Sequence, residues 1–220
     1  MHLTRKLAVT AVATVAGVVL VQPAAFAGPV GSGWTEHSPA WNVQIQSKGV
    51  ITSCPSSTNN ASGPGGSYAR SGGVQTFKLF NNGSNRVEAR IQDNYRTGQR
   101  QFEGEVKVTA GTDDESAMQI FGNDGDGATT LMIRSYAKNG GTLRGGGKDL
   151  ISNIYGKWVH VNVTHNATAS GGSFSIYING KLVQTANGPA GDHYFKYGVY
   201  GTLQTSGAEH QWRNVHFYRK

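Results

Sequence analysis

Three short segments of this sequence carry side chains whose types and spacing suit the binding of an anionic ligand. Residues 86–90 (RVEAR) place two guanidiniums and a carboxylate at alternate positions. Residues 119–121 (QIF) pair an amide with an aromatic ring, and residues 194–200 (YFKYGVY) add an ammonium and two phenols. Arginine binds a carboxylate through two parallel hydrogen bonds, so together the segments predict a basic groove lined with amide and aromatic groups. Gly198 is predicted to leave open space on the floor of that groove.

Each of these residues also has an ordinary structural explanation. Arg86, Glu88 and Arg90 fit a cross-strand ladder of ion pairs, which contributes little at a protein surface. Tyr194 and Tyr200 are simply good strand formers. The functional interpretation therefore depends on the three segments lying side by side in the folded protein.

The elements that must position these residues are β-strands. Apolar and polar residues alternate with a period of two through most of the chain, and no window shows a helical period. Turn signals such as Asn139-Gly140-Gly141 and Asn179-Gly180 separate the runs. The alternating runs are 86–92, 102–108, 118–121, 131–136, 159–164, 173–178 and 214–218. This pattern predicts an all-β jelly-roll sandwich of two antiparallel sheets, with residues 55–73 as a long surface loop.

The first 27 residues are predicted to be a secretory signal peptide. Arg5 and Lys6 precede an apolar run, and Ala25-Phe26-Ala27 forms a small-x-small cleavage signal. No later apolar run has the length that a bilayer crossing needs. We therefore expect a secreted, extracellular protein in which residues 28–220 form a single domain.

The charge and cysteine content narrow the class of partner. The chain has a formal net charge of +7, and its first 27 residues hold two basic and no acidic residues, which leaves +5 for residues 28–220. A basic secreted domain favours an anionic partner, and we expect an acidic polysaccharide. The basic residues are not concentrated in one run, which disfavours nucleic acid and membrane surfaces as partners. Cys54 is the only cysteine, so an internal disulfide is excluded, and we expect a monomer.

Together the three segments resemble the motifs of alginate lyases of polysaccharide lyase family 7. That family carries R-(S/T)-E-(L/V)-R, Q-(I/V)-H and YFKxGxYxQ in this order, and the third match is close. Here Phe121 replaces the histidine of the second motif, and Gly201-Thr202 replaces the end of the third. The whole chain after the leader is similar to this jelly-roll superfamily. The departures make it resemble the glucuronan lyases of polysaccharide lyase family 20 more than ordinary alginate lyases.

The resemblance implies cleavage of a polyuronate by β-elimination. The C5 proton of a uronic acid lies beside a carboxylate, whose charge must be neutralised before that proton can leave. By resemblance, Gln119 with Arg86 or Arg90 would neutralise the carboxylate, and Tyr200 would be the catalytic acid and base. A free phenol has a pKa of about 10, so a tyrosine base needs nearby cations such as Lys196. The substrate-binding residues implied are Arg86, Lys196, Tyr194, Glu88 and Arg134, with Glu88 orienting the arginines.

Phe121 bears on the stereochemistry, because the missing histidine is a second candidate acid or base in the lyases that have it. A single tyrosine can serve as base and acid only where the C5 proton and O4 lie on the same side of the ring. That holds for β-glucuronate and β-mannuronate and not for α-guluronate. We therefore predict syn elimination on a β-1,4-linked glucuronan, with polymannuronate second. The prediction requires that no histidine from elsewhere enters the groove, and His193 is the first to examine.

Other signals in the sequence are weaker. We expect no cofactor, although Asn123–Gly127 (NDGDG) could hold a structural calcium ion, a pattern more often seen in plain turns. Residues 145–148 (GGGK) lack the spacing of a phosphate-binding loop. The paired-carboxylate strand motif of jelly-roll glucanases is absent, which disfavours a hydrolase.

Two alternatives to a lyase stay open from the sequence. A non-catalytic module would use the same basic groove to hold an acidic carbohydrate without cleaving it. The presence of Tyr200, Lys196 and Gln119 together argues against that, because binding alone needs no phenol beside a lysine. The other alternative is nonspecific binding of nucleic acid or a cell surface through the +5 charge of residues 28–220.

Overall fold

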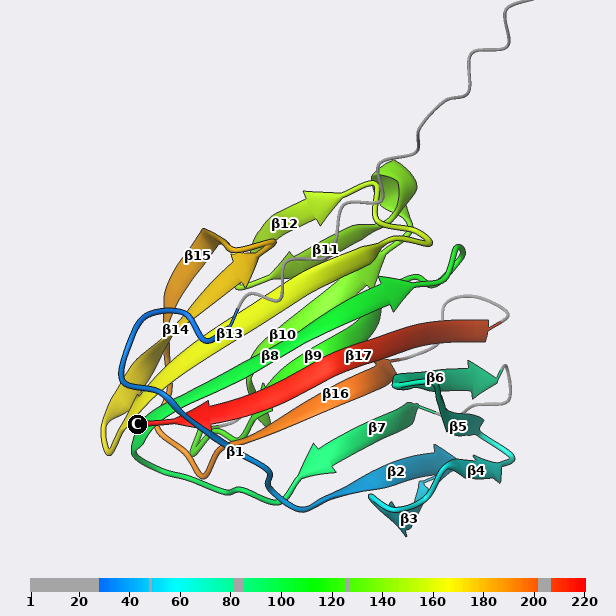
Figure 1. Ribbon diagram of the computed structural model, residues 1–220, viewed down its shortest axis with the longest axis horizontal. Helices are drawn as coiled ribbons and strands as arrows, with labels where there is room; N and C mark the ends of the chain where they lie inside the picture. Colours follow the sequence, from blue (N-terminus) through cyan, green and yellow to red (C-terminus); the bar gives the residue numbers. More distant parts are fainter. Residues whose placement is uncertain (1–27, 48, 81–84, 126, 202–206) are drawn as a thin grey trace, which may run out of the picture.

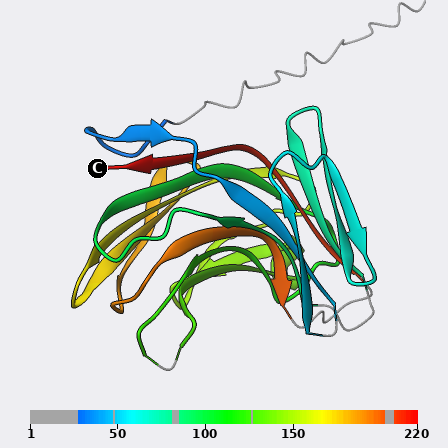
Figure 2. The same cartoon turned by 90° about the horizontal axis from the view of Figure 1, so that it is seen from below.

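A computed structural model describes residues 28–47, 49–80, 85–125, 127–201 and 207–220 of the chain. In this part, two antiparallel β-sheets pack face to face, as the views from the front and from below show (Figures 1 and 2). The predicted signal peptide lies outside the described residues. The two sheets confirm the prediction of an all-β sandwich.

Within the described residues, one sheet has nine strands and the other eight. The nine-stranded sheet has the spatial order β15 (Lys181–Gly188), β14 (Gly171–Ile178), β13 (Trp158–Thr168), β8 (Gly98–Val108), β17 (Gly207–Arg219), β6 (Val74–Phe80), β5 (Gly66–Ser71) and β4 (Asn60–Gly63), with β1 (Thr35–His37) paired to β17. The eight-stranded sheet has the order β12 (Lys148–Ser152), β11 (Thr142–Gly145), β10 (Thr129–Tyr136), β9 (Glu115–Phe121), β16 (Tyr194–Gly201), β7 (Arg86–Ile91), β2 (Trp41–Ser47) and β3 (Val50–Pro55). Strands distant in sequence are neighbours in both sheets, and the architecture is a jelly roll.

The core lies between the sheets and follows from the alternation of apolar residues. Val87, Ala89 and Ile91 of β7 are each at most 1% exposed, so the residues between them must face outward. An aromatic cluster joins the two sheets, with ring centroids of Phe102 on β8 and Tyr197 on β16 5.8 Å apart. Burying each such large side chain contributes about 1.5–3 kcal/mol. This core holds the outward-facing polar residues of β7, β9 and β16 in fixed register.

Residues 55–73 are not the long surface loop that the sequence predicts. They include β4 and β5, which pair with each other, and β5 also pairs with β6. Tyr68 on β5 is 1% exposed and packs against Phe77 with ring centroids 5.1 Å apart. A side chain at Gly66 would collide with the Lys78 carbonyl, so close strand packing explains the small residues there.

Helical structure in the described residues is limited to η1 (Lys138–Gly140), a single 3₁₀ turn. Accordingly, the described part of the chain contains no helix with the length and apolar character that a bilayer crossing requires. Cys54 on β3 is a free, partly buried thiol.

Candidate active site

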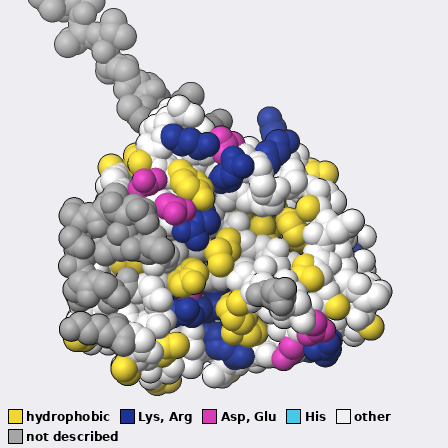
Figure 3. Space-filling model, turned by 180° about the vertical axis from the view of Figure 1, so that it is seen from behind, with side chains coloured by type: hydrophobic (Ala, Val, Ile, Leu, Met, Phe, Trp, Pro, Cys, Tyr) yellow, Lys and Arg dark blue, Asp and Glu magenta, His cyan; other side chains and the backbone are white. Residues whose placement is uncertain are grey.

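The fold brings the three sequence motifs together, because β9, β16 and β7 are consecutive strands of the eight-stranded sheet. Lys196 lies opposite Gln119 on one side and Arg90 on the other. Tyr200 lies opposite Arg86. The polar face of these strands is the outer face of the sheet, where Lys and Arg side chains gather among hydrophobic ones (Figure 3).

A bulge in β16 sets the position of Tyr200. Against β9, the register shifts between Tyr197 and Tyr200, so that Tyr200 lies opposite Ser116. Gly198 lies within this shift at φ +141, a conformation that favours glycine. A side chain there would collide with the Val87 carbonyl and the core ring of Phe77. The prediction that Gly198 opens the groove floor is therefore wrong, because glycine is needed for the bulge.

A cavity of about 460 Å³ opens beside these strands. Four residues from the motifs line it: Arg86, Gln119, Phe121 and Tyr200. Phe121, Thr129 and Met132 add a largely apolar wall, together with Gly127 and Ala128 from the loop before β10. A guanidinium, an amide and a phenol thus share one space with a hydrophobic surface, an arrangement suited to a sugar ring that carries a carboxylate.

Glu88 lies beneath the cavity as a buried hub, 1% exposed. It accepts hydrogen bonds from the Lys196 ammonium and from Gln119 Nε2, the latter at 2.5 Å. Arg86 Nη1 lies 3.7 Å from Glu88 Oε2. Glu88 therefore contacts Gln119 and Arg86, two groups that line the cavity, without lining it itself.

Lys196 is also buried, at 1% exposure, and does not line the cavity. Burial lowers the pKa of Lys196, while the Glu88 carboxylate opposes that shift. A buried ion pair is stable only when its remaining hydrogen-bonding capacity is met, as the amide of Gln119 does here for Glu88. Lys196 thus touches the cavity lining from behind, with its Nζ 5.7 Å from the ring centre of Phe121, and pairs with Glu88.

Gln119 keeps donor capacity for a ligand. An amide nitrogen carries two hydrogens, and Glu88 takes one of them. The amide oxygen is oriented by Thr129, whose hydroxyl donates to it at 3.5 Å. Both ends of the Gln119 side chain are therefore fixed, and its second N–H has no partner among the described residues.

Arg86 lies against Tyr200, with its guanidinium carbon 4.8 Å from the centre of the phenol ring. A cation at this distance interacts favourably with the ring face. Arg86 Nε is buried with no partner among the described residues. This pair is the closest approach of a cation to a phenol in the lining of the cavity.

Arg90, Tyr194 and Arg134 do not line the cavity. The Arg90 guanidinium carbon lies 4.1 Å from the ring centre of Tyr194, which in turn stacks on Phe121 with centroids 5.0 Å apart. Arg90 also donates to Asn94 Oδ1 at 2.9 Å. Arg134 is bound by Asp114, with Nε to Oδ1 at 2.8 Å. Arg90 and Tyr194 thus form a stack next to the cavity, whereas Arg134 points to a neighbouring carboxylate.

None of the six described histidines lines this cavity. His193 is fully buried, and its Nδ1–H donates to the Gly122 carbonyl at 3.1 Å. Burial lowers the pKa of His193 and brings that of His165 to about 3. The other described histidines bind groups away from the cavity and are His37, His160, His210 and His216.

Sequence reasoning missed the β10 side of the site. Thr129 and the loop residues before it fall outside the predicted run at 131–136, whereas Met132 falls within it. Met132 carries a usable signal, since a large apolar residue stands in the polar phase of that run. The position of the loop depends on how β9 and β10 pair, which no periodicity reveals.

The segment NDGDG at residues 123–127, which the sequence favours as a plain turn, makes turn and ion-pair contacts in the structure. Asp124 binds the Arg96 guanidinium with Nη2 to Oδ2 at 2.5 Å, and Asn123 Oδ1 accepts from Gly125 N at 2.7 Å. Asp126 lies outside the described residues. Within the described residues, no three His, Cys, Asp or Glu side chains come together in a metal-binding arrangement.

Comparison with known proteins adds a family and one curated relative. A family model described as alginate lyase matches residues 26–219. The citrate-binding protein of Hevea brasiliensis is 38% identical over 148 residues, which is 65% of this chain. The chain spans 60% of the length of that relative.

Solved structures share the fold at low sequence identity. The alginate lyase AlgAT5 of polysaccharide lyase family 7 is 19% identical with a TM-score of 0.62, over 83% of this chain and 95% of that one. An alginate lyase of Pseudomonas aeruginosa is 16% identical with a TM-score of 0.64, over 82% and 98%. These likenesses concern the jelly roll alone.

Proposed function

The chain belongs to the alginate lyase family, and from this premise we propose that it is a polysaccharide lyase acting on a β-1,4-linked polyuronate by syn β-elimination. One observation carries the proposal. A phenol, a guanidinium and an amide, from Tyr200, Arg86 and Gln119, line one cavity that no described histidine enters.

The cavity suits the first requirement of the reaction, which is to neutralise the uronate carboxylate. Arg86 and the free N–H of Gln119 are donors on its wall. Donors held in place before the reaction stabilise negative charge as it develops. Glu88 and Lys196 would act from below as positioning residues, because both are buried and Glu88 bonds to Gln119.

Tyr200 then handles the proton. Its phenolate oxygen removes the proton from C5, the electron pair forms the C4–C5 double bond, and the C4–O4 bond breaks. The proton on Tyr200 passes to the departing O4, so the enzyme ends the cycle unchanged. The neighbouring Arg86 cation, 4.8 Å from the ring centre, would stabilise negative charge that develops near Tyr200 in the transition state.

The apolar side of the cavity bears on the substrate. Phe121 stands where the resembled motif has a histidine, so Tyr200 is the one acid or base in the described lining. A single group must work on one face of the sugar ring. Glucuronan meets this requirement and is our first candidate, polymannuronate is the second, and polyguluronate is disfavoured.

The test is to incubate the purified protein with each of the three polymers and follow the ultraviolet absorbance of the unsaturated product end. We expect a rise with glucuronan, a rise with polymannuronate and none with polyguluronate. No rise with any polymer, or a preference for polyguluronate, would contradict the proposal.

A second candidate function is the binding of a small polycarboxylate without turnover. The observation that favours it is the name of the curated relative, a citrate-binding protein 38% identical over 148 residues. The guanidinium of Arg86 and the amide of Gln119 suit a carboxylate of either origin. Calorimetry with citrate separates the two functions, because tight citrate binding with no cleavage of any polymer supports the binding protein.

We also propose secretion, on the basis of the predicted leader. The basic start and the Ala25-Phe26-Ala27 signal place the cleavage after Ala27. N-terminal sequencing of protein recovered from culture medium is expected to begin at Gly28, and retention of residues 1–27 in a cell-bound protein would contradict it.

A further inference from the structure

His210 connects the opposite sheet to the bulge that positions Tyr200. It lies on β17 of the nine-stranded sheet and is fully buried. Its Nδ1 lies 2.6 Å from the carbonyl oxygen of Gly198, inside the register shift of β16. Its Nε2 lies 2.9 Å from the Ser135 hydroxyl on β10. One imidazole thus spans from one sheet to two strands of the other.

The contacts assign the hydrogens of this ring. A carbonyl oxygen only accepts, so Nδ1 of His210 carries a hydrogen and donates it to Gly198. In a neutral ring Nε2 is then an acceptor for the Ser135 hydroxyl at 2.9 Å, the shorter of two contacts of that hydroxyl, the other being the Glu115 carbonyl at 3.2 Å. Burial lowers the pKa of His210 to about 4, which agrees with a neutral ring near pH 7.

The bulge needs such a partner. An extra residue in one strand interrupts the ladder, and a buried carbonyl left without a donor destabilises the folded state. Removal of the bulge would shift β16 by one residue against β9, and a one-residue shift turns a side chain to the other face of the sheet. Tyr200 would then leave the cavity wall.

We infer that His210 is a positioning residue for the proposed lyase reaction, which holds Tyr200 in the cavity by donating a hydrogen bond to the Gly198 carbonyl. The expected loss of kcat rests on the proposed function. The expected displacement of Tyr200 rests on the geometry alone. It gives a buried histidine a role in the site without contact with the substrate.

Two variants of His210 separate the hydrogen bonds that it makes. In His210→Asn the amide nitrogen takes the place of Nδ1, so the bond to Gly198 is kept and the one to Ser135 is lost. In His210→Gln the amide takes the place of Nε2, so the bond to Ser135 is kept and the one to Gly198 is lost.

The experiment measures kcat and KM on glucuronan and the NMR signals of ring-labelled tyrosine, with the Tyr200 signal identified through Tyr200→Phe. We expect His210→Gln to move the Tyr200 signal and to lower kcat by roughly 10²-fold with KM little changed, as for a displaced catalytic group. We expect His210→Asn to keep the Tyr200 signal and kcat close to those of the wild type. A His210→Gln protein with the wild-type signal and kcat would overturn the inference.

Two further arms keep the test decisive. If the wild-type protein cleaves no polyuronate, the proposed function fails, and the Tyr200 signal alone still decides the role of His210. If His210→Gln does not fold, Ser135→Ala takes its place, because that change leaves the bond to Gly198 intact. An unmoved Tyr200 signal in Ser135→Ala supports the inference, and a displaced one overturns it.

Discussion

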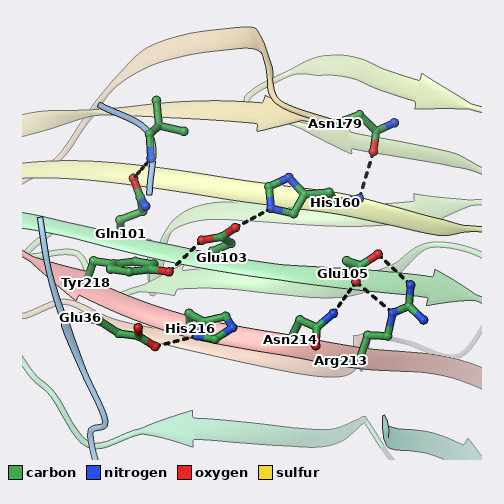
Figure 4. Close-up of polar contacts among 11 residues, drawn as sticks. Glu36, Gln101, Glu103, Glu105, His160, Asn179, Arg213, Asn214, His216 and Tyr218 are labelled. Atoms are coloured by element: carbon green, nitrogen blue, oxygen red, sulfur yellow. Dashed lines mark hydrogen bonds and ion pairs between the residues drawn. The ribbon is translucent and has the colours of Figure 1, made fainter. Parts of the chain in front are cut away.

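Two regions of this molecule bury glutamates among polar partners, yet only one of them lies beside the proposed site. Glu88 lies beneath the cavity of the eight-stranded sheet. Glu103 and Glu105 lie on the outer face of the nine-stranded sheet, 4% and 7% exposed (Figure 4). Glu103 accepts from Tyr218 at 3.0 Å and pairs with His160 at 2.9 Å, a trio that looks suited to proton transfer.

The difference lies in the neighbouring cavity, because the carboxylate oxygens have partners in both regions. Both oxygens of Glu103 have partners, and Arg213 binds both oxygens of Glu105 at 2.9 Å. The N-terminal segment also bonds to this face, where Val30 N donates to Gln101. Gln101 Nε2 and Asn162 Nδ2 on that sheet also lack a partner among the described residues, but neither residue lines the 460 Å³ cavity, whereas Gln119 does. A buried carboxylate by itself therefore marks no site, whereas unused donors that face a cavity do.

The largest expected effect compares the two tyrosines of these regions. We predict that Tyr200→Phe lowers kcat on glucuronan by roughly 10²–10⁴-fold, the usual contribution of a general acid or base. Tyr218→Phe is the matched control, because its hydroxyl bonds only to Glu103 among the described residues. Initial rates of absorbance increase provide the measurement. A Tyr200→Phe rate close to that of Tyr218→Phe would remove the phenol from the mechanism.

The next effect compares two buried glutamines. We predict that Gln119→Ala lowers kcat by roughly 10²–10³-fold, because one donor to the developing charge is lost. Gln101→Ala serves as the control. Gln101 lies on β8 of the nine-stranded sheet, where its side-chain oxygen accepts a hydrogen bond from Val30 N. Near-normal turnover in Gln119→Ala would show that the carboxylate is neutralised by other groups.

A third prediction concerns stability. Glu88→Gln leaves the fully buried Lys196 ammonium without its carboxylate, and breaking a buried ion pair costs roughly 3–5 kcal/mol. Glu103→Gln disturbs hydrogen bonds to Tyr218 and to the partly exposed His160, and should cost about 1–3 kcal/mol. Urea unfolding of both variants gives the two values. Equal losses would mean that the two carboxylates are energetically alike.

The sequence predicts single strands better than it predicts which strands are neighbours. The alternation of Val87, Ala89 and Ile91 predicts a strand with one buried face, and the structure has it. The adjacency of three distant motifs does not follow from periodicity, and only the family resemblance anticipated it. Strand pairing is set by contacts across the whole sheet, which local patterns do not encode.

The sequence does not predict the burial of Lys196 and Glu88, for a related reason. Period-two phase places both on the polar face, and they are on it. Their depth comes from neighbouring side chains that cover them, to the point that each is 1% exposed. Likewise, the β4–β5 hairpin lacks apolar alternation because close packing selects small residues such as Gly66.

A pH-dependent effect on stability involves the buried histidine behind the site. Burial lowers the pKa of His210 to about 4 in the folded protein, whereas in the unfolded chain the His210 imidazole takes up a proton near pH 6.5. The free energy of unfolding should therefore fall as the pH drops from 6.5 toward 4, by on the order of 3 kcal/mol for this group. Above pH 6.5 its contribution stays constant. Urea unfolding across this pH range should give a shallower decline for His210→Asn, and identical profiles would contradict the prediction.

The most direct test of the account is a crystal structure of the Tyr200→Phe protein with a glucuronan tetrasaccharide. We predict that one uronate carboxylate bonds to Arg86 and Gln119, and that the C5–H of the same sugar faces the ring of residue 200. A sugar bound on the outer face of the nine-stranded sheet, or a carboxylate held away from Arg86 and Gln119, would contradict it.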